Sequence, residues 1–152
     1  MRRIDMTQMI ENTALEEQLI DDIAEALVER GFIHLQHLLP QWLALKLMHE
    51  AKRLAALEFK PAGIGRNNSQ QLNSQVRTDS TLWFSGNSVI QQAYLDWMEQ
   101  LRMGLNRRLF MGLFDFECHF SHYSPGDFYQ RHLDAFKGSS NRILSSVFYL
   151  NP

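Results

Sequence analysis

The sequence has few of the features that mark secreted, membrane or nucleic-acid-binding proteins. It contains one cysteine, Cys118, so a disulfide bond within the chain is excluded. No apolar run approaches the ~18 residues of a membrane-spanning helix, and the first residues are not followed by the apolar stretch of a signal peptide. The net charge is −2 with no long run of one sign, which disfavours nucleic acid as the main partner. We therefore expect a cytoplasmic protein with neither a membrane nor a nucleic acid as its partner.

The composition is that of an ordinary globular domain. Hydrophobic residues make up 45% and charged residues 21% of the 152 residues, which is typical of globular proteins. Ten Phe, four Tyr and three Trp supply apolar area for a core. A chain of this length can bury a substantial core, so we expect residues 1–152 to form a single domain.

The first part of the chain predicts helices. The stretch from Thr13 to Glu16 has the form of a capping box, in which a hydroxyl residue is followed three positions later by a glutamate. Apolar residues then recur at helical spacing, at Leu15, Leu19, Ile20, Ile23 and Leu27. Gly31 predicts the end of this helix, and residues 32–36 predict a short strand. Pro40 is well placed to begin a second helix.

The later part changes from helical spacing to alternation. A third helix is predicted over residues 88–109, after an irregular segment at 61–75 and a stretch that is strand-like at both ends at 75–84. Two alternating runs then flank a turn at residues 124–127, and a further strand is predicted over 141–151.

Helices first and strands afterwards indicate the α+β class. We expect residues 1–110 to be mainly helical support, and residues 114–152 to form strands of an antiparallel sheet that the helices cover. The oligomeric state is not readable from this pattern.

One short motif, "YQRHLD" at residues 129–134, predicts metal chemistry. Side chains on a strand alternate between two faces, so His132 and Asp134 would lie side by side. An imidazole and a carboxylate can supply two of the three ligands in the facial triad of iron(II) oxygenases, and a second histidine must complete it. The alternative is an accident of composition: six histidines and average aspartate content give about one chance in four of some His-x-Asp.

The other histidines and the cysteine do little to favour a metal site. His119 and His122 lie three apart on the preceding predicted strand, so at most one of them could reach the pair. The remaining histidines are His34, His37 and His49, for which surface or hydrogen-bonded positions are the simpler interpretation. Cys118 is expected to pack as a small apolar residue.

The sequence around the pair resembles the prolyl-hydroxylase branch of the iron(II)- and 2-oxoglutarate-dependent dioxygenases. Four motifs agree in order and spacing: "QVRTDSTLWF" from Gln75, "YSPG" from Tyr123, "YQRHLD" from Tyr129, and the run from Arg142 to "YLN" at Tyr149. The first of these resembles the finger-loop segment of oxygen-sensing and bacterial prolyl hydroxylases, which places that segment at about residues 61–84. The resemblance implies a double-stranded β-helix, a jelly-roll-like core, of which residues 114–152 would be the first strands.

The resemblance also implies a function and its residues. It implies a dioxygenase that hydroxylates a prolyl residue in a protein or peptide substrate, with Fe(2+) bound by His132 and Asp134, 2-oxoglutarate as co-substrate, and ascorbate as a further cofactor. Tyr149 would donate its hydroxyl to the co-substrate and Tyr123 would line the cavity, although both could instead be core tyrosines with satisfied hydroxyls. Asp79 and Arg142 would form an ion pair between the two matched segments, the alternative being two solvated residues.

The chain departs from the family pattern at its C-terminal side. The second iron histidine of the family, and the basic residue that pairs with the distal carboxylate of 2-oxoglutarate, follow the His-x-Asp motif by several tens of residues, whereas this sequence ends 18 residues after Asp134. We therefore expect residues 1–152 alone not to turn over 2-oxoglutarate at a useful rate. The alternative function is a non-catalytic half-barrel that binds a partner, or an inactive fragment that another chain completes.

Overall fold

The computed structural model describes residues 14–55, 58–63, 72–132 and 142–151. The chain divides into two compact units, each built from two separate segments.

Unit 1 comprises residues 1–47 and 86–116, and unit 2 comprises residues 48–85 and 117–152. The predicted finger-loop segment therefore shares a unit with the segment that carries His132. Whether residues 1–152 form one domain stays a prediction.

Unit 1 is built around the contact between helices α2 (Glu17–Arg30) and α4 (Val89–Leu109). Gly104 makes the close approach possible, because a Cβ at this position would lie 2.8 Å from Cδ1 and 2.9 Å from Cγ2 of Ile20. Ile20 is buried at 2% exposure. The side chain that packs against α4 therefore occupies the space that a Cβ on Gly104 would need.

Apolar side chains from the helices and the segment before Pro40 form the core of unit 1. The buried members are Ile20, Ile23, Ala24, Ala26, Leu39, Leu43, Leu47, Tyr94, Trp97, Leu101 and Leu105. The helical spacing read from the sequence thus correctly predicts that Ile20 and Ile23 face the core. Helix α3 (Gln41–Ala55) begins after Pro40, whose carbonyl accepts hydrogen bonds from the backbone N–H groups of Leu43 and Ala44, and the division between the units falls within α3.

The ends of the helices agree with the sequence except at the first N-terminus. Gly31 ends α2 in the left-handed conformation, and the Ser88 hydroxyl accepts from the backbone N–H groups of Ile90 and Gln91 at the start of α4. The predicted capping box differs from the structure, in which the N-cap of α2 is Glu16 and the Glu16 side chain makes no capping hydrogen bond. Thr13 itself lies outside the described residues. Residues 32–36 were expected to form a strand but have no regular structure, since no neighbouring strand pairs with them in the described part of the chain.

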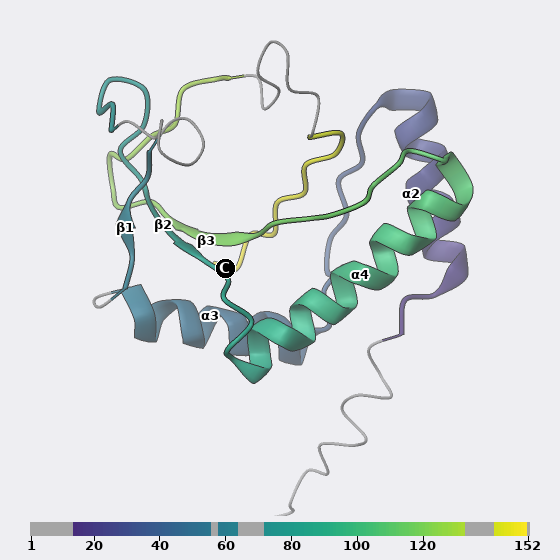
Figure 1. The fold of residues 1–152 in the computed structure, drawn as a ribbon, viewed down its shortest axis with the longest axis horizontal. Coiled ribbons are helices and arrows are strands. Elements are labelled where there is room, and N and C mark those ends of the chain that lie inside the picture. Colours follow the sequence, from purple (N-terminus) through teal and green to yellow (C-terminus); the bar gives the residue numbers. More distant parts are fainter. Residues whose placement is uncertain (1–13, 56–57, 64–71, 133–141, 152) are drawn as a thin grey trace, which may run out of the picture. The chain divides into compact units, whose positions relative to one another are not determined.

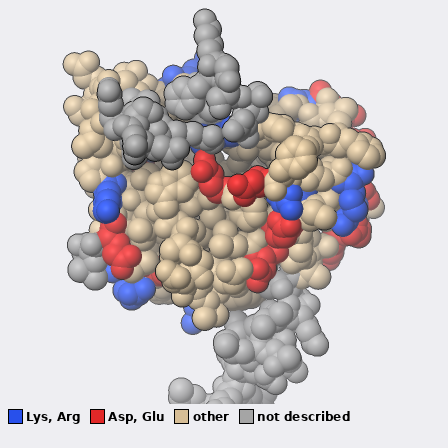
Figure 2. Space-filling view, viewed as in Figure 1, with Lys and Arg blue, Asp and Glu red and all other residues tan. Residues whose placement is uncertain are grey.

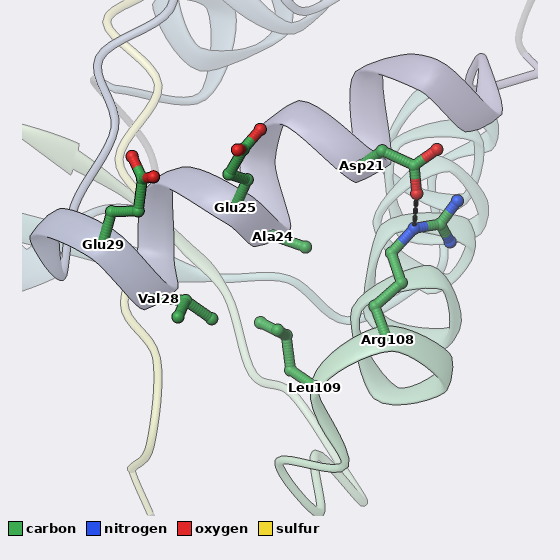
Figure 3. A pocket seen from close by; sticks show the side chains of 7 residues that line it. All are labelled: Asp21, Ala24, Glu25, Val28, Glu29, Arg108 and Leu109. Atoms are coloured by element: carbon green, nitrogen blue, oxygen red, sulfur yellow. Dashed lines mark hydrogen bonds and ion pairs between the residues drawn. The ribbon is translucent and has the colours of Figure 1, made fainter.

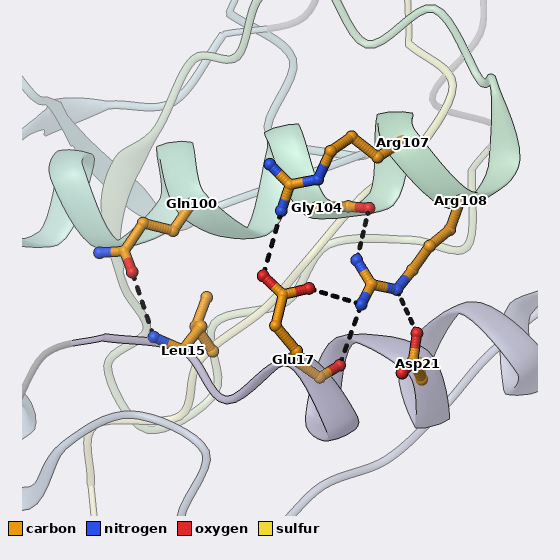
Figure 4. A network of polar contacts seen from close by, with 7 residues as sticks. All are labelled: Leu15, Glu17, Asp21, Gln100, Gly104, Arg107 and Arg108. Atoms are coloured by element: carbon orange, nitrogen blue, oxygen red, sulfur yellow. Dashed lines mark hydrogen bonds and ion pairs between the residues drawn. The ribbon is translucent and has the colours of Figure 1, made fainter.

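A polar seam joins the N-terminal end of α2 to the C-terminal end of α4 (Figure 4). The Arg108 guanidinium donates to the carboxylates of Glu17 and Asp21, and Arg107 reaches Glu17 at 3.3 Å. The hydrogen bond from Arg108 lowers the pKa of Glu17. Exposed ion pairs contribute little to the free energy of unfolding, so this seam sets the register of the two helices more than their stability.

Unit 2 contains a small antiparallel sheet with the strand order β1-β2-β3 (Figure 1). Its strands are β1 (Lys60–Pro61), β2 (Ser80–Trp83) and β3 (His119–His122). In the register of β2 and β3, Leu82 lies opposite Phe120. The buried Phe120 ring contacts the rings of Phe59 and Phe84, with centroids 6.4 Å and 4.6 Å away. One face of the sheet is thus packed with aromatic side chains.

The last predicted strand is not formed. Residues 142–151 have no strand assignment, and residues 133–141 lie outside the described part of the chain. Alternating sequence specifies a strand only where a neighbouring strand accepts its ladder of hydrogen bonds, so alternation over 141–151 is not sufficient. The described elements are a set of helices and a small antiparallel sheet.

The surface carries both signs of charge. On the face drawn in Figure 2, Lys and Arg side chains alternate with Asp and Glu side chains among the described residues, and no wide area of one sign is visible. Within the described residues, no helix is both long enough and apolar enough to cross a membrane.

The contact of Gly104 with Ile20 gives a test of the packing of unit 1. Gly104→Ala should lower the free energy of unfolding by up to about 2 kcal/mol, because overpacking outweighs the ~1 kcal/mol that alanine gains over glycine in a helix. Chemical denaturation would measure this loss. Adding Ile20→Ala should then destabilise the protein by less than the sum of the two single changes. Met103→Ala, at an exposed position on the same helix, is the control, and a Gly104→Ala variant more stable than the parent would contradict the packing.

Candidate functional site

The segment that carries His132 is held against the segment before β2. The backbone N–H of Thr78 donates to the carbonyl of Phe128 at 2.9 Å, and the N–H of Gln130 donates to the carbonyl of Val76 at 2.9 Å. These two bonds flank an isolated antiparallel bridge between Arg77 and Tyr129. The two segments thus pair over about three residues, which fixes Arg77 opposite Tyr129.

The turn that leads into this segment forms where the sequence predicted it. The backbone N–H of Asp127 donates to the carbonyl of Ser124 at 2.8 Å, and the N–H of Ser124 donates to the Asp127 carboxylate at 2.7 Å. The second of these bonds lowers the pKa of Asp127. Gly126 has a φ of +94°, in a region that side chains other than glycine rarely adopt.

Contacts with Tyr129 and Gln130 orient the ring of His132. Its face stacks on the ring of Tyr129, with centroids 3.6 Å apart and planes 17° apart. Its Nδ1 lies 2.7 Å from the carbonyl oxygen of Gln130. A carbonyl can only accept, so Nδ1 carries the proton and, in the neutral ring, Nε2 carries the lone pair.

This arrangement has the form of a metal-binding histidine. Ligating histidines ordinarily donate their second ring N–H to a carbonyl or carboxylate, which orients the ring for the metal. His132 therefore fits iron by the chemistry of its ring. Asp134 lies outside the described residues, so the His132–Asp134 pair stays a prediction, and within the described part of the chain no group of three metal-binding side chains is present.

The expected ion pair between Asp79 and Arg142 stays a prediction, and the structure shows another partner for each of the two residues. Asp79 is buried at 1% exposure and accepts two hydrogen bonds from the guanidinium of Arg77, at 2.8 Å from Nε and 2.6 Å from Nη2. Arg142 instead reaches the carboxylate of Glu117 at 3.3 Å on an exposed surface. Arg77 lies two residues before Asp79 in the segment that leads into β2, so its guanidinium is close to the carboxylate along the chain.

The two predicted tyrosines differ in their surroundings. Partial burial and the negative charge of Asp79 raise the pKa of Tyr123, so this phenol lies near the Arg77–Asp79 pair. Tyr149 is 81% exposed within residues 142–151. The role of each tyrosine toward a co-substrate stays a prediction.

The histidines on β3 have separate surroundings. His119 and His122 contact different rings, Trp83 at 4.7 Å and Phe59 at 6.3 Å between centroids, as expected for opposite faces of β3. Partial removal from water and the charge of Arg77 lower the pKa of His119. His34, His37 and His49 are exposed as well.

Sequence reasoning missed the roles of Arg77 and Tyr129. Their signals were present: Arg77 lies two residues before Asp79 in a strand-like run, hence on the same face, and Tyr129 belongs to the quoted motif. What the sequence lacks is the pairing of the two segments, which brings the guanidinium of Arg77 to 4.0 Å from the centre of the Tyr129 ring.

The described residues of each unit border a hollow. One, of about 230 Å³ in unit 2, is bordered by Arg77, Asp79 and Pro61 among others. The other, of about 400 Å³ in unit 1, lies between α2 and the end of α4 and has Val28 and Leu109 on its wall (Figure 3). None of the predicted site residues except Asp79 lines either hollow.

Comparison with solved structures gives an informative likeness. A crystal structure of a Pseudomonas putida prolyl-4-hydroxylase matches the chain with a TM-score of 0.71 and 38% sequence identity. The match covers 77% of this chain and 62% of that chain, so the present sequence spans less than two thirds of the length of that protein. No protein-family model and no curated protein matches. The described elements therefore adopt part of a prolyl-4-hydroxylase-like fold.

The Arg77–Asp79 pair gives a prediction about stability. Arg77→Ala or Asp79→Ala should each lower the free energy of unfolding by about 3–5 kcal/mol, because each leaves a buried charge without its partner. The double variant should lose less than the sum. Arg142→Ala removes an exposed pair and should cost at most about 1 kcal/mol. Denaturant titration measures the free energy of unfolding of these four variants. If reversing the charge at Arg142 restored the stability lost by reversing the charge at Asp79, the pairing of Asp79 with Arg77 would be contradicted.

Cys118 gives a prediction about reactivity. Burial raises the pKa of its thiol to about 11, against an ordinary value of 9.0. The folded protein should therefore react with a disulfide reagent at pH 8 about 100-fold more slowly than the unfolded chain, since the thiolate is the nucleophile. The ratio is measured from the rate at which the disulfide reagent releases its coloured thiolate, once in native buffer and once in denaturant. Equal rates would show that the thiol is accessible and ionises normally.

Proposed function

We propose that this chain carries part of the active site of an iron(II)- and 2-oxoglutarate-dependent dioxygenase that hydroxylates a prolyl residue in a protein or peptide. The observation that carries the proposal is the likeness to a prolyl-4-hydroxylase over 77% of the chain at 38% identity. The orientation of His132 supports it independently, because its ring is held as a metal ligand would be. The double-stranded β-helix core is part of the same proposal.

The residues have separate parts in the proposed site. His132 through Nε2, and Asp134 through its carboxylate, would hold Fe(2+). Bound iron with 2-oxoglutarate supplies the oxidation that inserts one atom of O2 into a C–H bond while the co-substrate becomes succinate and carbon dioxide. Tyr149 would donate its hydroxyl to a carboxylate of 2-oxoglutarate, and Tyr123 would line the cavity and help to exclude water from it. Ascorbate would serve as a further cofactor.

The third protein ligand and the basic partner of 2-oxoglutarate also belong to the proposal. By resemblance they follow the His-x-Asp motif at a distance that exceeds the 18 residues between Asp134 and Pro152. We propose that a longer chain or a second chain supplies them. A non-catalytic half-barrel that binds a partner remains the alternative function, and the same experiment separates the two.

Succinate release and metal binding test the proposal. An extended chain, which includes the residues that the gene encodes after Pro152, should bind Fe(2+). In the presence of ascorbate and a panel of prolyl peptides, it should release succinate from 2-oxoglutarate. His132→Ala or Asp134→Ala should reduce release to background, whereas His49→Ala, at an exposed position, should not change it. Tyr149→Phe should weaken 2-oxoglutarate binding about 10- to 100-fold, the equivalent of a lost charge-assisted hydrogen bond.

Each alternative has its own outcome. The 152-residue chain should release little succinate, because two ligands hold iron weakly. Release by that chain that survives His132→Ala would place the site elsewhere. Iron binding without succinate release by the extended chain, across the whole peptide panel, would favour the non-catalytic function.

A further inference from the structure

We propose that Arg77, acting through the ring of Tyr129, is a positioning residue for His132. Arg77 touches neither a metal nor a substrate in this proposal. Its part is to hold Tyr129 in the plane on which the imidazole stacks. The inference rests on the proposed function, because it takes His132 to be a metal ligand.

The guanidinium of Arg77 is fixed in its own plane first. Nε and Nη2 each donate to a different oxygen of Asp79, at 2.8 Å and 2.6 Å, and Nη1 reaches the carbonyl of Gly63 at 3.4 Å. The side chains of Arg77 and Asp79 are 11% and 0% exposed. A planar fork held at two donors has little rotational freedom.

The fixed guanidinium then orients the next ring. Its central carbon lies 4.0 Å from the centre of the Tyr129 ring, within the range of a cation–π contact. The backbone bridge between Arg77 and Tyr129 sets this meeting, since cross-strand partners project to the same face. The other face of Tyr129 carries the imidazole of His132, at 3.6 Å and nearly parallel. The Tyr129 ring thus contacts both the guanidinium of Arg77 and the imidazole of His132.

Two restraints on different parts of the imidazole define the direction of its lone pair. The stack with Tyr129 fixes the plane of the ring, and the bond from Nδ1 to the Gln130 carbonyl fixes its rotation within that plane. The lone pair on Nε2 then has one direction before any metal arrives. Without the stack the ring could turn away from the carbonyl, and the metal would have to restore its orientation on binding.

A simpler account would make the Arg77–Asp79 pair a structural element only. That account predicts that changes at Tyr129 alter the stability of unit 2 and nothing particular to His132. The positioning account predicts an effect on the tautomer of His132 in metal-free protein and on metal affinity, and it predicts that a phenylalanine at position 129 preserves both.

The experiment uses Tyr129→Leu, Tyr129→Phe, Arg77→Lys and, as a matched control, Phe59→Leu. The control removes an aromatic ring that stacks elsewhere in unit 2, on Phe120. Long-range ¹H–¹⁵N spectra at pH 8 report which nitrogen of His132 carries the proton in metal-free protein. Calorimetric titration with Co²⁺, well below the melting temperature of every variant, reports metal affinity.

Tyr129→Leu should bring His132 into a mixture of tautomers and weaken Co²⁺ binding about 10- to 100-fold, as loss of a partner that orients a ligand does. Arg77→Lys should give a smaller change in the same direction, because lysine keeps the charge and loses the planar fork. Tyr129→Phe and Phe59→Leu should leave the tautomer unchanged and the affinity within about threefold of the parent.

The outcomes separate this inference from the function on which it rests. If the parent binds Co²⁺ through His132 and Tyr129→Leu changes neither tautomer nor affinity, the positioning role is wrong and the proposed metal site stands. Equal weakening by Phe59→Leu would also overturn the role, since the effect would be one of general stability. If neither the 152-residue chain nor the extended chain binds Co²⁺ while Tyr129→Leu still mixes the tautomers, the proposed metal site is wrong and the control of the His132 ring by the stack is upheld.

Discussion

The buried pair between Arg77 and Asp79 is the interaction on which the candidate site depends. Asp79 is buried at 1% exposure, and a carboxylate in that position needs a hydrogen-bonded cation. Arg77 meets this need with two bonds and at the same time presents its face to Tyr129. One residue thus satisfies a buried charge and links the segment before β2 to the segment that carries His132. Arg77 contacts the Tyr129 ring, and the His132 ring stacks on that same ring.

The two units illustrate different sources of order. Unit 1 is held by apolar packing of α2 against α4, with Gly104 giving the room for Ile20. Unit 2 has a small sheet, the buried carboxylate of Asp79 and an aromatic cluster around Phe120. Polar contacts therefore have a larger part in defining unit 2. The same contacts that stabilise it also orient the candidate ligand, so function and stability are coupled there.

Much of the helical part could be predicted from the sequence, because its determinants are local. Ser88 caps α4, Gly31 ends α2, and α3 begins directly after Pro40, since caps and stops act over a few residues. The errors concern strands. Residues 32–36 and 141–151 have strand-like sequences, yet the described residues of both segments form no strand. A strand needs a neighbour, and the neighbour is not encoded in the strand itself.

The sequence by itself determined the order of the motifs, the turn at residues 124–127 and the spacing that marks His132 as a candidate ligand. It could not decide which cation lies beside Asp79, and the pair with Arg142 that the family resemblance implies stays a prediction. Only the tertiary structure decided that Arg77 takes that place, and that Tyr129 lies between Arg77 and His132. The reason is physical: burial of a charge and the stacking of rings depend on which segments pair in space, and the segments of this site are about fifty residues apart in the chain.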